Sequence, residues 1–370
     1  MARNTHHLID AYRQLRNNTE NVVLATIIET LGSTYQKAGA RMLIAQNGEL
    51  NGLLGGGCFE QDLVEQARSV FETGKPKTLF YDMRSPDDVV WGLGLGCNGA
   101  VRVLLQLLDH GNDFSPLNSI AEASRNGTAD ILATVYQSDH PTYLAGDSFF
   151  LTGAELEGLV QSVNMPWLIV KTAKQTWVQN KSIIETHVID GHAVKIFFDM
   201  ILPPSQLLVF GAGADVLPVA ELAKTLGWRV TIVDHRPAYI KPERFPKVDD
   251  LLHSMPEELH ERLPLNRFDA VVLMTHSIEY DERYLRVIST SRIPFIGLLG
   301  PVQRRDRLLN SLALDASKIA AKVFGPVGLD IGAETPEEIA LSILAGIHAA
   351  INDRIGGQLS SNITDVQHDS

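Results

Sequence analysis

The stretch QLLVFGAGA, residues 206–214, decides the fold of the second half of the chain. Its first five residues form a short, mainly apolar strand, and Gly211 and Gly213 follow at once. An apolar helical period then runs to about Leu226, where Gly227 closes the helix. Glycines between a strand and a helix let the backbone turn tightly and approach a ligand closely. The stretch therefore predicts the first turn of a dinucleotide-binding βαβ unit.

The next strand supports this interpretation. It ends at Asp234, 23 residues after Gly211, where a carboxylate can hold ribose hydroxyls. Val216 stands where a third glycine is expected, so the helix must pack closely on the strand by other means. Arg236 lies close to Asp234 and would suit a phosphate as well as a ribose. The pattern predicts a Rossmann-like fold and leaves nicotinamide binding open.

Strands and helices continue to alternate after this unit. Apolar strands are expected at residues 270–274 and 295–299, and the second leads into Gly300. Such alternation predicts a doubly wound parallel sheet that is covered on both faces. His276 follows the first of these strands, at the edge where ligands bind in open sheets. It is the best candidate base, and a structural histidine is the alternative.

The first half contains a different glycine run, LLGGGCFE, at residues 53–60. The two leucines predict the end of a strand, and an apolar helical period follows the glycines. The free amides and the dipole of a helix start favour a phosphate or another anion, and they lower the pKa of a thiol. A tight turn with a buried cysteine is the alternative, because Glu60 already supplies negative charge there. The candidate residues are Gly55, Gly56, Gly57 and Cys58.

A second glycine-rich loop, GLGLGCNG at residues 92–99, contains Gly96 and Cys97. Four glycines this close predict an irregular backbone near a ligand, with a surface loop as the alternative. The chain has two cysteines, and both stand in glycine loops. We therefore predict that Cys58 and Cys97 lie beside a cleft between two domains, within reach of one ligand.

A predicted hairpin directly precedes the first glycine run. Its strands are expected at residues 41–45 and 50–54, and its turn at Asn47-Gly48, a pair that favours two-residue hairpin turns. Lys37 lies in the loop before it, and Arg41 begins its first strand. These two cations are candidate partners for an anion at the glycine run.

Composition limits the class of protein. The chain has 370 residues, 45% of them hydrophobic, which suggests two domains with real cores. A formal net charge of −12 argues against nucleic acid or an anionic membrane as partner. No stretch approaches the roughly 20 apolar residues of a membrane span, and the N-terminus has no apolar signal core. We expect a soluble cytoplasmic protein in which the cysteines form neither a zinc pattern nor a disulfide framework.

Residues 111–203 are less informative. Expected strands at 131–136 and 183–189 suggest antiparallel structure. His187 and His192 are five residues apart, which suits neither a helical nor a strand face, so surface histidines are favoured over a metal pair. We expect an N-terminal α+β domain over residues 1–203, a Rossmann-like domain over 204–352 and a polar tail over 353–370.

Taken together, these motifs resemble the XdhC/CoxI family, accessory proteins that mature molybdenum hydroxylases such as xanthine dehydrogenase. The resemblance covers nearly the whole chain except the middle segment and the tail. One departure is Ala214, because the family commonly has a histidine after Gly-Ala-Gly. The matching residues are Gly32-Ser33-Thr34, Ala38 to Met42, Gly56-Gly57-Cys58, Gly94 to Cys97, Phe210 to Gly213, Val233-Asp234, Met274-Thr275-His276, Gly297 to Gly300, Gly325 to Gly332 and Thr335 to Ala340.

The resemblance implies binding of the molybdenum cofactor, molybdopterin, and its handover in sulfurated form to a xanthine dehydrogenase-type hydroxylase. A cysteine desulfurase is a further candidate partner, and a homo-oligomer such as a dimer is implied. Molybdopterin carries a phosphate, which suits a helix N-terminus, and its soft metal chemistry suits the thiolates of Cys58 and Cys97. The candidate cofactor-binding residues are Lys37, Arg41, Gly55, Gly56, Gly57, Cys58, Gly96, Cys97, Gly211, Gly213, Asp234, Arg236, His276 and Gly300.

Two other classes of function stay open. An NAD(P)-dependent oxidoreductase would use the Rossmann half, although the sequence has no Tyr-x-x-x-Lys pair and no convincing acid–base constellation for hydride transfer. A docking protein would hold no cofactor at all. An accessory protein without a substrate of its own is favoured over an enzyme.

Overall fold

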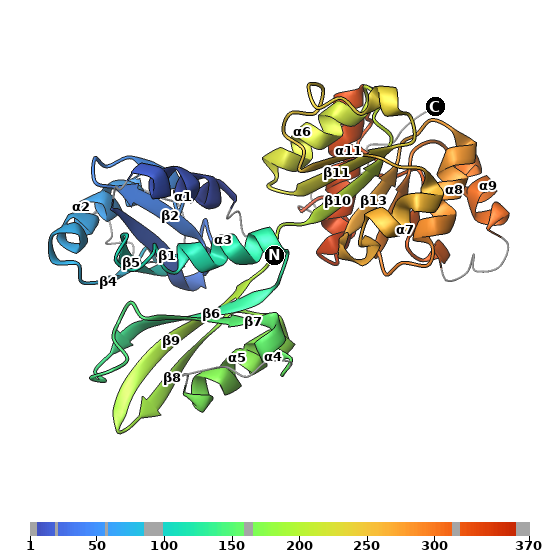
Figure 1. Cartoon of the computed structure of the whole chain (residues 1–370). Helices are drawn as coiled ribbons and strands as arrows, with labels where there is room; N and C mark the ends of the chain where they lie inside the picture. Colours follow the sequence, from blue (N-terminus) through green and yellow to red (C-terminus); the bar gives the residue numbers. More distant parts are fainter. Residues whose placement is uncertain are drawn as a thin grey trace. The chain divides into compact units, whose positions relative to one another are not determined.

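The computed structural model describes residues 6–18, 21–55, 58–84, 99–158, 166–312 and 319–359. The chain divides into two compact units, residues 1–204 and residues 205–370 (Figure 1). Each unit has sheets and apolar cores of its own.

The first sheet of unit 1 is antiparallel and has the strand order β3-β2-β1-β5-β4. Its strands are β1 (Val22–Gly32), β2 (Arg41–Ala45), β3 (Leu50–Gly52), β4 (Lys77–Asp82) and β5 (Gly99–Leu108). The expected hairpin is therefore present, but the prediction for its end is wrong. β3 stops at Gly52, which has a φ of 105°, so Leu53 and Leu54 belong to the turn that comes next.

Helices cover both faces of this sheet. Side chains alternate between the faces of a strand, so Val23 and Ile27 of β1 pack with Leu63 and Ala67 of α2. The neighbouring positions on β1 face α1 and α3. The bounds of the three helices are α1 (His6–Asn18), α2 (Cys58–Thr73) and α3 (Leu117–Asn126).

The remainder of unit 1 forms a second antiparallel sheet, with the order β7-β6-β9-β8. One face packs against α4 and α5, and the other contacts the first sheet through Tyr136 and Phe197. A buried ion pair between Arg41 of β2 and Asp199 of β9 also links the two sheets. The elements are β6 (Asp130–Ser138), β7 (Ser148–Thr152), α4 (Gly153–Leu156), α5 (Trp167–Gln179), β8 (Ile183–Ile189) and β9 (His192–Ile201).

Unit 2 contains a six-stranded parallel sheet, with the order β12-β11-β10-β13-β14-β15. Counted from β10, this is the order 3-2-1-4-5-6 of a dinucleotide-binding fold. The predicted Rossmann-like sheet is confirmed. The strands are β10 (Gln206–Phe210), β11 (Arg229–Asp234), β12 (Asp250–His253), β13 (Ala270–Leu273), β14 (Phe295–Leu298) and β15 (Val323–Phe324).

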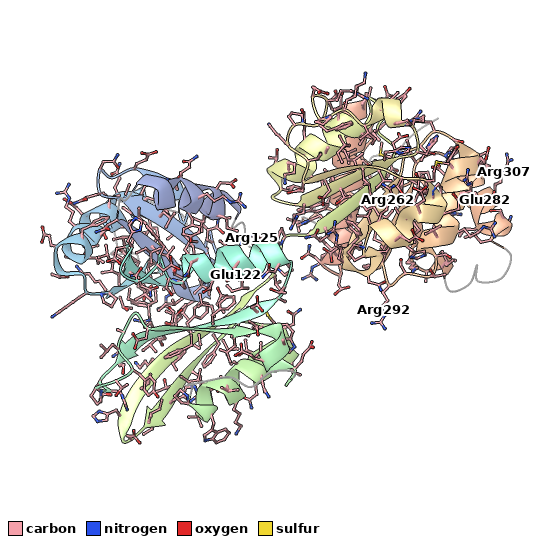
Figure 2. The ribbon with its side chains drawn as sticks, in the orientation of Figure 1. Glu122, Arg125, Arg262, Glu282, Arg292 and Arg307 are labelled. Carbon is pink, nitrogen blue, oxygen red and sulfur yellow. The ribbon has the colours of Figure 1, made fainter. Side chains whose placement is uncertain are left out.

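Helices lie on both faces of this sheet, as Figure 1 shows. α6 and α11 contribute to one apolar core, while α7, α8 and α9 contribute to the other. Charged side chains such as Arg262, Glu282 and Arg307 lie on the outer side of the second group (Figure 2). The helices are α6 (Val216–Thr225), α7 (Leu259–Arg262), α8 (Ile278–Ile288), α9 (Val302–Ser311) and α11 (Pro336–Ile351).

The start of α11 reflects the local sequence closely. The Thr335 hydroxyl accepts a hydrogen bond from the Glu338 amide, and the Glu338 carboxylate accepts one from the Thr335 amide. This capping box, with proline at the first helical position, fixes where the helix begins. Within the part of the chain described, no helix is long and apolar enough to cross a membrane.

Candidate cofactor-binding sites

The glycine turn of unit 1 is held by a carboxylate from the helix that it precedes. Glu60 in the first turn of α2 is 3% exposed, and its Oε1 accepts hydrogen bonds from the amides of Leu54 (3.1 Å) and Gly55 (2.5 Å). A side chain on Gly55 would meet the Phe59 ring, because an added Cβ would lie 3.0 Å from Phe59 Cδ1. Two amides of this turn are therefore already bonded to an anion, which the protein itself supplies.

Several of the predicted residues lie outside the described part of the chain. Gly56, Gly57, Gly96 and Cys97 are among them, and for Cys58 only the backbone, at the start of α2, is described. The prediction that the two thiols approach one ligand stays a prediction.

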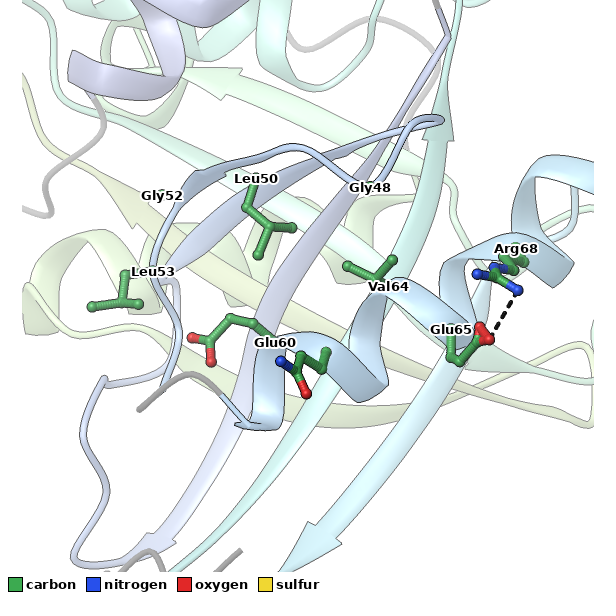
Figure 3. Close-up of a pocket in the computed structure, with 9 residues that line it drawn as sticks. Gly48, Leu50, Gly52, Leu53, Glu60, Val64, Glu65 and Arg68 are labelled. Carbon is green, nitrogen blue, oxygen red and sulfur yellow. Dashed lines mark ion pairs between the residues drawn. The ribbon is translucent and has the colours of Figure 1, made fainter.

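A groove lies beside this turn, between β3 and α2 (Figure 3). It has a volume of about 470 Å³, and Leu50, Leu53 and Val64 are its apolar lining residues. Glu60 lines it at the end nearest the glycine turn, and at the other end Glu65 forms an ion pair with Arg68 (2.9 Å). The groove is thus continuous with the turn through Glu60.

Of the two cations predicted for this turn, one lies in the interior. The side chain of Arg41 is 2% exposed, and its Nη2 lies 2.7 Å from Oδ2 of Asp199, which is fully buried. A second guanidinium nitrogen of Arg41 donates to the carbonyl of Gly39 (3.0 Å). Lys37 is exposed in the loop between β1 and β2. Arg41 therefore holds the two sheets of unit 1 together.

The glycine turn of unit 2 connects β10 to α6. Gly211 has a φ of 114°, and an added Cβ would collide with the backbone carbonyl of Met274 on the neighbouring chain segment after β13. Glycine is thus required here by conformation and by space. Gly213 also lacks room, because its Cβ would lie 2.5 Å from Oδ1 of Asp215.

Asp234 is the last residue of β11 and stands at the C-terminal edge of the sheet, as predicted. Its fully buried carboxylate accepts hydrogen bonds from the Ala212 amide (2.7 Å) and the Arg236 amide (2.8 Å). The Arg236 guanidinium donates to both of its oxygens, at 2.9 and 2.7 Å. Burial alone would raise the pKa of Asp234, but these hydrogen bonds outweigh it and hold the pKa below its usual range.

Two arginines border the glycine turn of unit 2. The side chain of Arg236 is 34% exposed and its guanidinium lies over the Tyr239 ring, 3.8 Å from the ring centre. Arg244 donates from Nη1 to the carbonyl of Ala212 (3.0 Å) and lies 6.0 Å from the same ring centre. Arg244 was not predicted from the sequence, because nothing in the local pattern around it indicates a contact with a turn 32 residues earlier.

His276 reaches the same turn from the end of β13. Its Nε2 lies 2.8 Å from Oδ2 of Asp215, and its ring comes within 4.0 Å of the position that a Cβ on Gly213 would take. The backbone of His276 is left-handed, with a φ of 58°, which is uncommon for a residue other than glycine. The structure therefore brings Gly211, Gly213 and His276 together where the strand order reverses, the place where open sheets bind ligands. Asp215 was not predicted.

Gly300 lies beside Arg304, which is connected to the segment of His276 through Asp281. It has a φ of 104°, and an added Cβ would lie 2.9 Å from Cδ of Arg304. Arg304 donates to Oδ2 of Asp281 (2.7 Å), while Oδ1 of Asp281 accepts from the Thr275 hydroxyl (2.6 Å). This chain of contacts fixes the segment that carries His276. Across the residues that the structure describes, no group of three or more His, Cys, Asp or Glu side chains could hold a metal ion.

Comparisons with known proteins identify the family. The family described as XdhC and CoxI matches residues 15–82, and the XdhC Rossmann domain matches residues 207–347. A protein of Bacillus subtilis (strain 168), named as a probable xanthine dehydrogenase subunit, is 33% identical over 346 residues, which is 93% of this chain and 96% of the relative. The chain belongs to the XdhC and CoxI family.

A solved structure extends the similarity to three dimensions. A crystal structure of a xanthine dehydrogenase from Bacillus halodurans is 30% identical, covers 96% of this chain and 98% of its own, and has a TM-score of 0.71. A protein of Escherichia coli (strain K12) named uncharacterized protein YqeB is 31% identical over 170 residues, 45% of this chain and 31% of its own. In this XdhC and CoxI family protein, one matched region lies in each unit.

Proposed function

We propose that this protein binds the molybdenum cofactor, protects it in sulfurated form and delivers it to a xanthine dehydrogenase-type hydroxylase. The observation that carries the proposal is the whole-length relation to the Bacillus subtilis protein, whose name is that of a probable xanthine dehydrogenase subunit, with 33% identity over 93% of this chain. The relation spans both units, so the activity is expected to use both.

The phosphate of molybdopterin is assigned to the glycine turn of unit 1. The Glu60 carboxylate already accepts hydrogen bonds from the amides of Leu54 and Gly55. The phosphate is therefore proposed to bind the amides of Gly56, Gly57 and Cys58. Lys37, exposed in the loop before β2, is the cation proposed to accompany it, since Arg41 is committed to Asp199. The thiolates of Cys58 and Cys97 are proposed to contact molybdenum or the transferred sulfur, which a cysteine desulfurase would supply.

The edge of the sheet in unit 2 is assigned to a phosphate of a nucleotide, either part of the cofactor or a regulator. Arg236 supports this, because a third of its side chain is open to solvent beside the turn. Gly211 and Gly213 form the turn after β10 at this edge, and His276 and Gly300 follow β13 and β14 there. Asp234 is proposed to act through Arg236, because its own oxygens already accept four hydrogen bonds.

A second function is favoured by one observation. The pair of His276 and Asp215 lies where the order of the parallel strands reverses, and such a pair could exchange a proton with a bound substrate. This arrangement supports an NAD(P)-dependent oxidoreductase as the alternative.

Cofactor content separates the two functions. The full chain, purified from cells that make molybdopterin, is analysed for molybdenum, for pterin and for nicotinamide nucleotide. It is then mixed with a cofactor-free xanthine dehydrogenase, and the appearance of hydroxylase activity is followed. Loading and activation support delivery. Steady NAD(P)-linked turnover by a protein that never loads molybdenum would replace the proposal with the oxidoreductase.

Two variants locate the loading site in the same assay. Gly55→Val places a branched side chain against the Phe59 ring and is expected to abolish loading, whereas Gly357→Ala, at a position with open space, is the matched control. Alkylation tests the cysteines: if both Cys58 and Cys97 can be blocked while molybdopterin still binds, they have no part in holding it.

A further inference from the structure

The outer face of α5 carries four exposed side chains in one line. Trp167 is 68% exposed and Val178 is 83% exposed, and Lys171 and Lys174 between them are exposed as well. Helical positions four, seven and eleven residues after the first fall within an arc of about 60°, at 100° per residue. These four residues form a single line along the helix, which we call the α5 stripe.

The stripe is not needed for the core of the sheet that α5 covers. The opposite side of the helix supplies the buried residues Ile169, Thr172, Ala173 and Thr176. α5 packs through that side on β6 and β9. A tryptophan two-thirds exposed on a folded helix is unusual, because this side chain is on average deeply buried. Exposed tryptophan is instead enriched where proteins meet partners.

The charge of the stripe differs in sign from that of the whole protein. α5 has no acidic residue in its sequence, WLIVKTAKQTWVQ, whereas the chain has a formal net charge of −12. Lys171 lies 5.3 Å from the centre of the Trp167 ring, which holds its cation beside the indole. In the described part of the chain, the ion pairs include neither Lys171 nor Lys174. The stripe therefore offers two cations framed by two apolar side chains.

We propose that the α5 stripe docks an acidic surface of a partner protein, which receives the indole of Trp167 in an apolar recess. Resting on the proposed function, this partner is the xanthine dehydrogenase-type hydroxylase. A symmetric contact with a second copy would place the lysines of one stripe against those of the other, and this repulsion disfavours a dimer formed through the stripe. A membrane fits less well, because each lysine adds only about 1 kcal/mol of attraction to an anionic surface.

Binding of the full-length protein to a cofactor-free xanthine dehydrogenase tests the docking surface. The double variant Lys171→Glu/Lys174→Glu is expected to weaken binding at least tenfold at low salt, and Trp167→Ala about tenfold. The matched controls are Lys75→Glu/Lys247→Glu, which changes the net charge equally at exposed positions elsewhere, and Leu144→Ala, which removes another exposed apolar side chain. The controls are expected to bind within twofold of the unchanged protein. Binding of the unchanged protein should weaken as salt rises, since exposed charges are screened.

The outcomes separate the docking surface from the proposed function. Variants that bind the hydroxylase as tightly as the unchanged protein overturn the docking surface and leave cofactor delivery standing. An unchanged protein that binds the hydroxylase through the stripe but never loads molybdenum supports docking and removes delivery. No binding by the unchanged protein overturns the docking proposal. A loss of self-association in the lysine variants, or their failure to bind anionic vesicles that the unchanged protein binds, also overturns it.

Discussion

The two strand-to-helix turns of this protein look alike in sequence and are stabilised differently. In unit 1 the carboxylate of Glu60 comes from the helix after the turn and accepts from two turn amides. In unit 2 the carboxylate of Asp234 comes from the neighbouring strand and accepts from one turn amide and from Arg236. Glycine runs of this kind are interpreted as anion cradles. Here each turn already binds a carboxylate of the protein itself, so a ligand at either turn would have to use the donors that remain.

The arginines that the sequence places near each turn differ even more. Arg236 stays beside its turn, partly open to solvent, and its partner is the carboxylate that the turn itself uses. Arg41 instead points into the interior of unit 1 and pairs with a residue 158 positions away. The turn of unit 2 therefore has an arginine that is partly open to solvent beside it, whereas Arg41 serves the packing of unit 1.

The largest expected effect comes from Arg41. Arg41→Ala leaves Asp199 charged and buried without its guanidinium, and breaking such a pair costs about 3–5 kcal/mol. Urea denaturation measures the loss. Arg102→Ala, which breaks an ion pair with Glu29 that is about 30% exposed, is the control and should cost under about 1 kcal/mol.

A double variant that removes both charges tests the same ion pair in a second way. Arg41→Met/Asp199→Leu removes both charges and should recover most of the stability, because apolar pairs often replace buried ion pairs without loss. If Arg41→Ala instead kept full stability and lost only the cofactor, Arg41 would be a ligand and the two arginines would be alike.

The second effect concerns Asp234. Asp234→Ala removes the acceptor of the Ala212 amide and of Arg236, and should destabilise unit 2 by about 3 kcal/mol. Asp250→Ala, at the 45% exposed partner of Arg267, is the control. Molybdenum content is measured at a temperature where the variant is folded. If the Asp234→Ala variant still loads molybdenum, the edge of unit 2 is a regulatory site. If it no longer loads molybdenum, this edge is part of the cofactor site.

The third effect is smaller and concerns anion binding. Glu60→Ala frees the amides of Leu54 and Gly55, with an expected cost of about 1–2 kcal/mol of stability. The freed amides should bind inorganic phosphate more tightly than the unchanged protein does, measured by calorimetry. Glu60→Gln keeps an acceptor oxygen and should change both quantities less. An unchanged phosphate affinity in Glu60→Ala would mean that these amides do not face a ligand.

The structural features that were predicted correctly from the sequence depend on local patterns of residues. The strands β10, β11, β13 and β14 of unit 2, the turn at Gly211 and the position of Asp234 at the strand end result from periodicity and from glycine conformation. The capping box at Thr335 is equally local. Such features are determined by residues that are close together in the sequence, so they can be predicted from one sequence.

The contacts that it could not predict join distant parts of the chain. Nothing near Arg41 indicates Asp199, and nothing near Arg244 indicates Ala212, because pairing over such separations is set by how whole sheets pack. In the sequence, Asp215 is an ordinary acidic residue at the start of a helix. Its contact with His276 results from the position of β13 beside β10. The strands β7, β9, β12 and β15 were also not predicted, and each is defined in the structure by its pairing with a neighbouring strand.

The smallest expected effect is a pH dependence of stability at the turn of unit 2. His235 stacks on Tyr280, with ring centres 3.5 Å apart. Burial lowers the pKa of His235; the nearby Asp234 opposes this, while positive neighbours such as Arg236 and Arg283 reinforce it. The unfolded chain, with an ordinary histidine pKa near 6.5, therefore binds the proton more readily than the folded protein.

This difference fixes the sign of the effect. The contribution of His235 to stability is complete above about pH 6.5 and is lost as the pH falls from there toward the lowered pKa of the folded state. His235→Asn should therefore flatten the acid side of the stability profile of unit 2 in calorimetry between pH 5 and 8, whereas His260→Asn, at an exposed position on α7, should not. His187 in unit 1 was predicted at the surface, but it is only 5% exposed, and burial lowers its pKa as well. His187→Gln should therefore flatten the profile of unit 1 alone. A profile of unit 2 that is equally steep with and without His235 would show that this histidine is as easily protonated in the fold as outside it, and would contradict the prediction.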